Sequence, residues 1–410
     1  MGNIAKQKMM ALAGDEAVAY AVKQSDVDVV AAYPITPQTI IVEKFSDYVA
    51  NGEVETEFVC VESEHSAMAA SLSASATGAR VFTATASAGL ALMHEMLFVA
   101  SGCRTPVVMA IANRALSAPL NIHGDHSDSM AERDSGWIQL YAENAQEVYD
   151  SIIQAFQIAE NLTVLLPVMV GLDGFTLSHT LENVETLLDE DVKKFVGVRK
   201  FPNVLTHEGK TVPFKLDPAN PLTLGPIALQ NYYFEFKRQQ EQAMENALAV
   251  IKQVNSDYTK LSGRSYGNGL VEAYCLEDAE VAAVCLGSTA GTMKTVVDKL
   301  REEDVKAGLL RLRTFRPLPV EEIRSALANV KALAIMDKCI SFGGNGGPVF
   351  HEIRHLLYEV ANRPFVINYI YGLGGRDTSP DELRSIFENL QRILQVGRVE
   401  KPIQYLGLRE

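Results

Sequence analysis

The chain has 410 residues, of which 47% are hydrophobic and 21% are charged, a balance typical of a globular protein with ample material for buried cores. Its length predicts two or three domains. Lys and Arg number 37 and Asp and Glu 51, so the formal net charge is −14. This acidic balance argues against a nucleic-acid surface or an anionic-membrane surface, because both need clustered cations.

Nothing in the sequence predicts a membrane span, a leader or a cluster-binding motif. No stretch approaches the roughly 18 consecutive apolar residues of a spanning helix, and the first residues show no cleavage pattern. We therefore expect a cytoplasmic protein. No two cysteines form a C-x-x-C pair, so no zinc ribbon or iron–sulfur ligand run can be assigned. We expect reduced, mostly buried thiols at Cys60, Cys103, Cys275, Cys285 and Cys339.

Strand and helix signals alternate along the first part of the chain. β-branched and apolar runs predict strands at residues 26–32, 55–61, 80–84, 106–112 and 163–171. Helical patterns predict helices at residues 63–76, 88–101 and 144–161. Continuous apolar runs separated by helices are typical of parallel strands covered on both faces. From residue 172 to 228 the regularity fades, and four prolines within 213–226 predict a long irregular excursion.

A second α/β block follows a long charged helix, which we predict at residues 232–258. Its predicted strands are 280–286, 309–313, 332–337 and 365–371, and its predicted helices are 289–303, 320–327, 348–360 and 381–394. We therefore predict an α/β fold with a first domain at residues 1–230, a bridging helix at 231–262 and a second domain at 263–410.

Four loops with chemically useful side chains follow predicted strands of the first domain. In open α/β sheets ligands bind at the carboxyl ends of the strands, so these loops are candidates for one site. The first, YPITPQT, is stiffened by two prolines and places the Thr36 hydroxyl beside a helix start. A plain strand–turn–helix connection explains this loop as well.

The second loop, VESEHS, places Glu62, Glu64 and His65 where a strand ends and a helix begins. One reading is simple capping, because acids are favourable in a first helical turn. The other is that one glutamate points into a cleft and hydrogen-bonds a ring nitrogen. The third loop, TASAGL, consists of small residues that permit either close approach of a ligand or a tightly packed helix start.

The fourth loop begins with Arg114 directly after an apolar strand, where a guanidinium suits bidentate binding of a carboxylate. It continues through His123, Asp125, His126 and Asp128. These four residues could be drawn as metal ligands, but a hydrogen-bonded loop is the better interpretation, because neighbouring loop residues without a further ligand are a poor metal signature.

Taken together, these strings resemble the α subunits of 2-oxoacid:ferredoxin oxidoreductases, most closely those of the pyruvate enzyme. The strings YPITPQT, ESEHSAM, TASAGLALMHE, NRALSAP and GDHSDSMAERDSGWIQLYAENAQEV occur in the family's order. RTFRPLP and YGLGGRD in the second block also match, so the resemblance covers nearly the whole chain.

The resemblance implies a thiamine diphosphate-binding domain of the pyrimidine type, followed by a domain like the C-terminal domain of transketolase. Pyruvate is then oxidatively decarboxylated to acetyl-coenzyme A and carbon dioxide, and the electrons pass to ferredoxin. The α chain shares thiamine diphosphate with a β chain, while Mg²⁺ and 4Fe–4S clusters belong to β, γ and δ partners. Coenzyme A is a substrate. The chain carries no metal of its own and is inactive alone.

The resemblance also implies roles for single residues. Glu64 hydrogen-bonds the aminopyrimidine ring, and this contact stabilises the tautomer that helps to remove the reactive thiazolium proton. Glu62 is the lesser candidate. Thr36 and Arg114 contact the substrate carboxylate and count, with Glu64, as the catalytic set. The implied cofactor contacts beyond Glu64 are Pro34, Ile35 and Ser87.

Other functions stay open at this point. A branched-chain 2-oxoacid is an alternative substrate, and the β chain of an E1-type 2-oxoacid dehydrogenase has a similar domain order. A non-catalytic assembly subunit is a third alternative. An NAD-dependent dehydrogenase is disfavoured, because no predicted strand is followed by G-x-G-x-x-G. The glycine-rich run at residues 343–348 could cradle a phosphate, but a turn that opens a helix is our interpretation.

Overall fold

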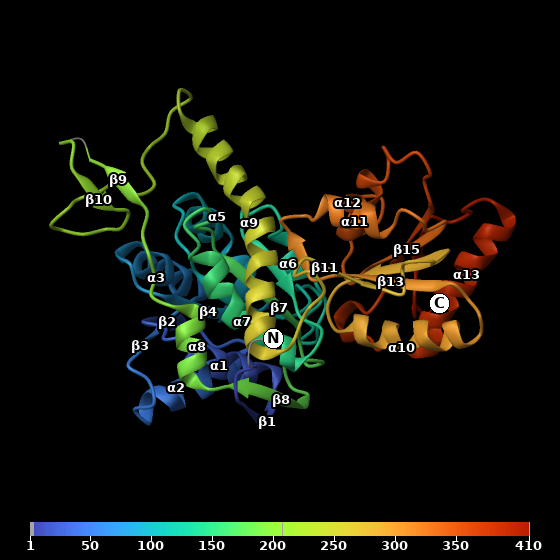
Figure 1. Cartoon of the computed structure of the whole chain (residues 1–410), viewed down its shortest axis with the longest axis horizontal. Coiled ribbons are helices and arrows are strands. Elements are labelled where there is room, and N and C mark those ends of the chain that lie inside the picture. Colours follow the sequence, from blue (N-terminus) through green and yellow to red (C-terminus); the bar gives the residue numbers. More distant parts are fainter. Residues whose placement is uncertain (1–3, 207, 410) are drawn as a thin grey trace.

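The computed structural model describes residues 4–206 and 208–409 and contains two α/β bodies side by side (Figure 1). The first sheet has seven strands in the order β14-β6-β7-β5-β4-β2-β3. Only β14 is antiparallel to its neighbour. The strands are β2 (Val29–Ala32), β3 (Glu57–Cys60), β4 (Val81–Thr85), β5 (Val108–Asn113), β6 (Ile138–Tyr141), β7 (Val168–Asp173) and β14 (Thr314–Arg316).

Helices cover both faces of the first sheet, because its buried strands present apolar side chains alternately to the two sides. On β5, Val108, Ala110 and Ala112 pack in the cluster that contains α1, α2 and α7, whereas Met109 and Ile111 pack with α3 and α5. The helices are α1 (Gly14–Gln24), α2 (Thr39–Ala50), α3 (Glu64–Thr77), α4 (Ser87–Leu92), α5 (His94–Gly102), α6 (Ser127–Ala131), α7 (Ala145–Ala159) and α8 (Asp189–Val196).

The second sheet has six strands in the order β11-β13-β12-β15-β16-β17, and only β11 is antiparallel to its neighbour. Helices α10 and α13 cover one face, and α11 and α12 cover the other (Figure 1). The strands are β11 (Val271–Tyr274), β12 (Val281–Cys285), β13 (Ala307–Leu312), β15 (Ala332–Asp337), β16 (Phe365–Ile370) and β17 (Ile403–Tyr405). The helices are α10 (Thr289–Glu302), α11 (Val320–Ala326), α12 (Pro348–Leu356) and α13 (Pro380–Val396).

The helix α9 (Tyr233–Ser262) connects the two bodies. Its buried residues Ala243, Ala247, Ile251, Val254 and Tyr258 recur at helical spacing, so one face packs on the first domain. Its first turns and the hairpin β9 (Asn203–Leu205) and β10 (Thr211–Pro213) project from the body at the top of Figure 1. A second two-stranded sheet pairs β1 (Gln7–Ala13) with β8 (Leu181–Leu187).

Buried ion pairs join the two domains near β14, the strand that leaves the second domain and joins the sheet of the first. Strand β14 adds to the edge of β6. Just before it, Arg311 and Arg313 reach Glu147 at the start of α7, and the Arg313 Nε to Glu147 Oε1 distance is 3.0 Å. All three side chains are fully buried. Buried guanidinium groups need such partners, because an unpaired buried charge is strongly destabilising.

The predicted α/β fold is confirmed, and several predicted elements need correction. The helix expected at 88–101 is two helices that meet at Met93. The strand expected from residue 163 begins at Val168, because the chain turns first and Leu165 has a φ of +44°. The irregular stretch 172–228 contains β8, α8, β9 and β10, whose short or half-exposed strands lack an apolar run.

Two further expectations concern the cysteines and the membrane. Only two of the five thiols, Cys285 and Cys339, are buried, while Cys103 and Cys275 are half-buried and Cys60 is exposed, so the expectation of mostly buried thiols is wrong. Cys60 ends the edge strand β3, where no further strand covers it. Among the residues that the structure describes, no helix is both long enough and apolar enough to cross a membrane.

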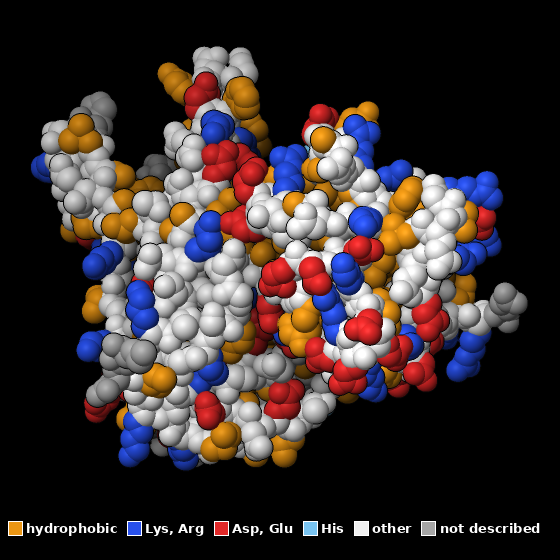
Figure 2. Space-filling model, turned by 45° about the vertical axis from the view of Figure 1, so that its right-hand side comes forward, with side chains coloured by type: hydrophobic (Ala, Val, Ile, Leu, Met, Phe, Trp, Pro, Cys, Tyr) orange, Lys and Arg blue, Asp and Glu red, His pale blue; other side chains and the backbone are white. Residues whose placement is uncertain are grey.

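Acidic and basic side chains are mixed over the second domain on the face drawn in Figure 2. Several of these charges form exposed ion pairs, such as Arg384 with Glu303 and Arg301 with Asp278. Pairs of this kind contribute little to stability, so this surface is a solvated face.

Candidate functional site

The four loops singled out in the sequence follow four neighbouring strands at one edge of the first sheet. Strand β2 pairs in parallel with β3 and β4, and β4 pairs in parallel with β5. Parallel strands end on the same side, so the loops that begin at residues 33, 61, 86 and 114 meet there. The sheet therefore brings most of the predicted site residues to one edge.

Glu64 is the first residue of α3 and is only 7% exposed. Ser63 caps the helix, since its hydroxyl accepts the Ser66 N–H at 3.2 Å. Within the described part of the chain, no hydrogen bond engages the Glu64 carboxylate. A buried carboxylate without a partner is costly, so this group is available to an incoming donor.

Gly89 and Thr85 flank the Glu64 carboxylate. A Cβ at position 89 would lie 2.6 Å from Glu64 Oε1 and 2.6 Å from Thr85 Oγ1, so only glycine leaves room for the carboxylate. Thr85 Oγ1 is itself buried and has no hydrogen-bond partner among the described residues. Two polar groups without a hydrogen-bond partner therefore lie beside Gly89 between α3 and α4, and we call this place the recess.

Glu62 points elsewhere. It is exposed, and its carboxylate accepts a hydrogen bond from the Ser66 hydroxyl, which lowers its pKa. This glutamate is thus committed to the first turn of α3. His65, which follows Glu64, lies 3.8 Å from Glu95 of α5 through Nε2.

Arg114 and Thr36 come together directly. Arg114 is 8% exposed, and its Nη1 donates to the Thr36 carbonyl oxygen at 2.8 Å. Its Nε donates to the Asn121 carbonyl oxygen at 3.0 Å. Nη2 has no hydrogen-bond partner among the described residues, so one N–H edge of the guanidinium remains for an anion. Thr36 is exposed beside it.

Gln38, which the sequence analysis missed, holds the loop that contains Pro34 and Ile35. It is fully buried; its Oε1 accepts the Ile35 N–H at 3.1 Å and its Nε2 donates to the Ala84 carbonyl oxygen at 2.9 Å. Ile35 is half-buried and Pro34 is exposed. The loop after β2 is therefore fastened to β4 by one amide side chain.

Asp128 ties together the loops after β4 and β5. Its Oδ2 accepts the backbone N–H of Ser87 at 3.0 Å and of Arg114 at 2.9 Å, and its Oδ1 accepts Asn113 Nδ2 at 2.8 Å. Burial raises the pKa of Asp128 to about 6, although these hydrogen bonds oppose the rise. Because no local pattern marks a carboxylate with such distant partners, sequence reasoning treated it only as a loop acid.

Ser87 is fully buried and has a φ of +47°. Its hydroxyl donates to the Ala115 carbonyl oxygen at 2.7 Å. This hydroxyl is already used inside the protein, so a direct contact between Ser87 and a cofactor stays a prediction. In the structure Ser87 joins the start of α4 to the loop after β5.

The histidines and aspartates of residues 123–128 turn to different partners. Asp125 accepts the Ser127 N–H at 2.9 Å, and His126 Nε2 lies 2.7 Å from Asp173 Oδ1. Across residues 4–206 and 208–409, no three acidic, histidine or cysteine side chains are grouped as metal ligands would be. In the structure the loop is held by hydrogen bonds.

The glycine-rich run before α12 packs on an internal acid. Asp337 Oδ1 accepts the Val349 N–H at 2.8 Å and Oδ2 accepts the Phe350 N–H at 3.1 Å. A Cβ at Gly347 would lie 2.2 Å from Asp337 Cγ. The start of α12 is therefore occupied by a carboxylate, which would repel a phosphate.

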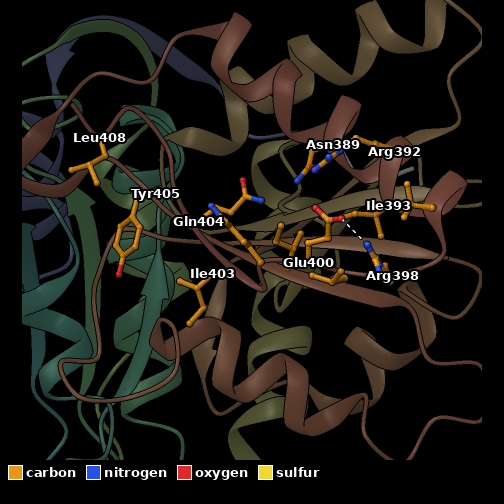
Figure 3. A pocket seen from close by; sticks show the side chains of 13 residues that line it. Asn389, Arg392, Ile393, Arg398, Glu400, Ile403, Gln404, Tyr405 and Leu408 are labelled. Atoms are coloured by element: carbon orange, nitrogen blue, oxygen red, sulfur yellow. Dashed lines mark hydrogen bonds and ion pairs between the residues drawn. The ribbon is translucent and has the colours of Figure 1, made fainter. Parts of the chain in front are cut away.

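A separate hollow of about 610 Å³ lies at the outer edge of the second sheet. Figure 3 shows Asn389 and Arg392 of α13 on one side and Gln404 and Tyr405 of β17 on another. Arg398 pairs there with Glu400 at 3.2 Å. None of the predicted site residues lines this hollow.

Comparisons with known families match both halves of the chain. Residues 20–256 match the thiamine diphosphate-binding domain of the pyruvate flavodoxin/ferredoxin oxidoreductases. Residues 279–383 match core domain II of pyruvate:ferredoxin oxidoreductase.

Several curated proteins are similar over nearly their whole length. The pyruvate synthase subunit PorA of Methanocaldococcus jannaschii is 52% identical over 381 residues, which are 93% of this chain and 94% of that protein. PorA of Thermotoga maritima is 51% identical and covers 98% of each chain. The ketoisovalerate oxidoreductase subunit VorA of Pyrococcus horikoshii is 43% identical over 97% of this chain and 98% of that protein.

Solved structures share the fold. The 2-oxoglutarate:ferredoxin oxidoreductase from Magnetococcus marinus, solved with 2-oxoglutarate, coenzyme A and succinyl-CoA bound, superposes with a TM-score of 0.74 at 22% identity. The match covers 93% of this chain and 65% of that chain. A split-gene transketolase, described as an inactive tetramer, gives a TM-score of 0.51 at 13% identity over 94% of this chain and 100% of that chain.

The raised pKa of Asp128 predicts a pH dependence of stability. The Asp128 carboxyl binds a proton more tightly in the folded chain than in the unfolded chain, where its pKa is near 3.8. Protonation of Asp128 therefore stabilises the folded chain at low pH, and this stabilisation is lost as the pH rises through about 6. Between pH 7 and pH 5 the free energy of unfolding of the wild type should rise by about 1 kcal/mol relative to that of Asp128→Asn. Urea denaturation of both proteins at the two pH values measures this difference, and parallel pH dependences would contradict the assignment.

Proposed function

The chain belongs to the pyruvate flavodoxin/ferredoxin oxidoreductase family, and from this premise we propose what its site does. The family predicted from the sequence is confirmed, and the chain is an α subunit of a 2-oxoacid:ferredoxin oxidoreductase. The reaction is the oxidative decarboxylation of pyruvate with formation of acetyl-coenzyme A and carbon dioxide, and we propose ferredoxin as the electron acceptor. Glu64, Arg114 and Thr36 are the residues through which this chain takes part.

The observation that carries this proposal is the uncommitted, buried carboxylate of Glu64 in the recess beside Gly89. A nitrogen heterocycle that offers an N–H or a ring nitrogen suits the Glu64 carboxyl, which accepts from an N–H when ionised and donates to a ring nitrogen when protonated. The aminopyrimidine ring of thiamine diphosphate is such a group. When bound, thiamine diphosphate would supply a nucleophilic carbon for the ketone and a cationic ring that takes up the electron pair released with carbon dioxide.

Glu64 holds or releases a proton at its carboxylate against the ring nitrogen. A charge-assisted hydrogen bond of this kind strengthens in a water-poor recess, since a low local dielectric strengthens electrostatic interactions. Glu64 lies on the first turn of a 14-residue helix, so its carboxylate is held by the backbone rather than by a mobile loop. The recess thus fixes the geometry on which proton transfer depends.

Arg114 and Thr36 orient the substrate. The free Nη2 of Arg114 is available to the carboxylate of the substrate. The hydrogen bond from Nη1 to the Thr36 carbonyl oxygen keeps Thr36 next to the guanidinium. A guanidinium pair with a 2-oxoacid carboxylate fixes the ketone relative to the cofactor and so reduces the entropy cost of reaction. Pro34 and Ile35 lie on the same loop, and we propose that they contact the cofactor.

We propose that this chain supplies half of the centre and that β, γ and δ subunits supply the rest, including Mg²⁺ and 4Fe–4S clusters. Exposed apolar side chains support a surface for partners. Leu92 of α4 and Phe98 and Val99 of α5 are exposed beside the site. A second exposed set lies on β9, on the segment before α9 and on the start of α9: Leu205, Ile227, Leu229, Tyr232, Tyr233 and Phe234.

A branched-chain 2-oxoacid is the second candidate substrate, because a ketoisovalerate oxidoreductase subunit is 43% identical to this chain. Part of the substrate pocket is formed by partner chains in our proposal, so this chain alone does not fix the side-chain preference. Comparing kcat/KM for pyruvate and 3-methyl-2-oxobutanoate in the assembled complex decides between them. A complex that reduces no ferredoxin or viologen, and acylates lipoamide instead, would favour the E1-type alternative.

Glu64→Gln should lower coenzyme A-dependent reduction of a viologen dye by pyruvate by roughly two orders of magnitude or more, because the amide keeps the shape but cannot transfer the proton. The complex is purified with its partners bound, so that a loss of assembly is seen separately. Glu62→Gln is the matched control and should retain wild-type turnover, because among the described residues the side-chain hydrogen bond of Glu62 goes to Ser66, away from Gly89. Full activity of Glu64→Gln would remove this residue from the mechanism.

Gly89→Ala should reduce the same activity by about tenfold or more, because the new methyl carbon would lie 2.6 Å from Glu64 Oε1 and displace it. The substitution lies inside α4, where alanine is otherwise favourable to a helix by up to about 1 kcal/mol. Gly102→Ala at the end of α5 is the control, since its nearest neighbour would be 3.9 Å away. Equal activities in the two variants would argue against the recess.

A further inference from the structure

The loop that begins with Arg114 is hydrogen-bonded to the second domain. We call residues 114–126 the arginine loop. Asn121 Nδ2 donates to the Gly374 carbonyl oxygen at 3.0 Å, and the Gly374 N–H donates to Asp125 Oδ2 at 3.1 Å. Gly374 and Gly375 have positive φ values, and a Cβ at either would lie within 2.4 Å of the loop. The turn after β16 is therefore shaped to receive this loop.

The end of the arginine loop is held by a closed set of three residues. The His126 N–H donates to the Lys338 carbonyl oxygen at 2.9 Å. His126 Nε2 lies 2.7 Å from Asp173 Oδ1, and Lys338 Nζ lies 2.8 Å from Asp173 Oδ2. Asp173 ends β7 of the first domain and Lys338 follows β15 of the second. The three residues therefore contact one another in a ring that spans both domains.

The start of α10 adds to this set. The Ser288 N–H and hydroxyl both donate to Asp173 Oδ2, and the N–H distance is 3.1 Å. Gly287, with a φ of +66°, brings the chain close enough, because a Cβ there would lie 3.1 Å from Asp173 Oδ2. Although burial alone would raise the pKa of Asp173, the charges of Lys338 and His126 hold it well below its usual range. The carboxylate is thus a fully buried anion with donors from both domains.

We propose that Lys338 and Asp173 are positioning residues for the 2-oxoacid: through His126 they fix the arginine loop, and so aim the Arg114 guanidinium at the substrate carboxylate. This inference rests on the proposed function of Arg114. Neither residue touches the substrate. The second domain then acts as a brace: it holds the arginine loop in the position that binds the substrate. Its contacts increase the affinity for the 2-oxoacid rather than the rate of the chemical step.

The loop geometry explains why the effect falls on Arg114. Arg114 Nε donates to the Asn121 carbonyl oxygen, and the Ala115 N–H donates to the His123 carbonyl oxygen at 3.0 Å. The residues that hold the guanidinium therefore belong to the same segment that the second domain holds. Glu64 lies on α3 and makes no hydrogen bond to this segment among the described residues. Its indirect link is Ser87, which Asp128 also holds, so we expect proton transfer to change less than substrate binding.

The test compares two lysines that both bridge the domains. Lys338→Met removes the ion pair to Asp173. Lys294→Met, the matched control, removes the ion pairs from Lys294 to Glu143 of the first domain and Glu272 of the second, both at 2.9 Å and away from the arginine loop. Both lysines are mostly buried, with side chains 12% and 21% exposed. Each variant is purified as the assembled complex.

Lys338→Met should raise the KM for pyruvate by roughly tenfold or more and leave kcat within about threefold, because it loosens a substrate contact without touching the reacting atoms. Lys294→Met should leave both constants near wild type. Ser288→Ala, a milder change at the same carboxylate, should raise KM about two- to tenfold, and it decides the matter if Lys338→Met does not assemble.

Hydrogen–deuterium exchange gives a readout that does not depend on the reaction. Peptides from residues 114–126 should exchange faster in Lys338→Met than in Lys294→Met. An unchanged KM in both Lys338→Met and Ser288→Ala, or an equal rise in Lys294→Met, would overturn the inference. If the wild-type complex shows no pyruvate-dependent reduction, the proposed function fails instead, while the exchange rates still report on the brace.

Discussion

The carboxylate of Asp128 is the interaction on which the rest of the site depends. It is fully buried, yet it accepts the backbone N–H groups of Ser87 and Arg114 and the side-chain amide of Asn113. A buried anion needs such donors, and the donors in turn are fixed by the anion. Through Ser87 it sets the start of α4, and with it the place of Gly89 against Glu64. Through Arg114 it sets the guanidinium. One side chain thus relates the acid–base group to the substrate-binding group.

Two more buried carboxylates, also at strand ends, accept hydrogen bonds from several segments of the chain. Asp173 after β7 gathers donors from both domains, and Asp337 at the end of β15 occupies the start of α12. Helices begin with unpaired backbone N–H groups, and the acids at these strand ends accept them from the starts of α10 and α12. Asp173 thus joins the two domains, whereas Asp337 joins β15 to α12 within the second. Gly347 follows from this, since only glycine lets the backbone approach Asp337 so closely at that position.

Much of the fold could be predicted from the sequence, because continuous apolar runs identify the central parallel strands and helical spacing identifies α7 and α9. The order of the loops also brought Glu64, Arg114 and Thr36 forward as candidates. Gln38 and Asp128 were out of reach, since their partners lie 46 and 41 residues away in the chain. The break between α4 and α5 was missed because small apolar residues continue through Met93. The return of β14 to the first sheet, after a whole domain has intervened, leaves no local signal.

The central claim is that Glu64 meets the cofactor ring in the recess beside Gly89. A structure of the assembled complex with thiamine diphosphate bound measures this most directly, as the distance from the Glu64 carboxylate to the nearest ring nitrogen of the pyrimidine. We predict a hydrogen-bonded distance of about 2.6–3.2 Å. A carboxylate turned away from the ring, with its oxygens bound by protein groups instead, would contradict the account.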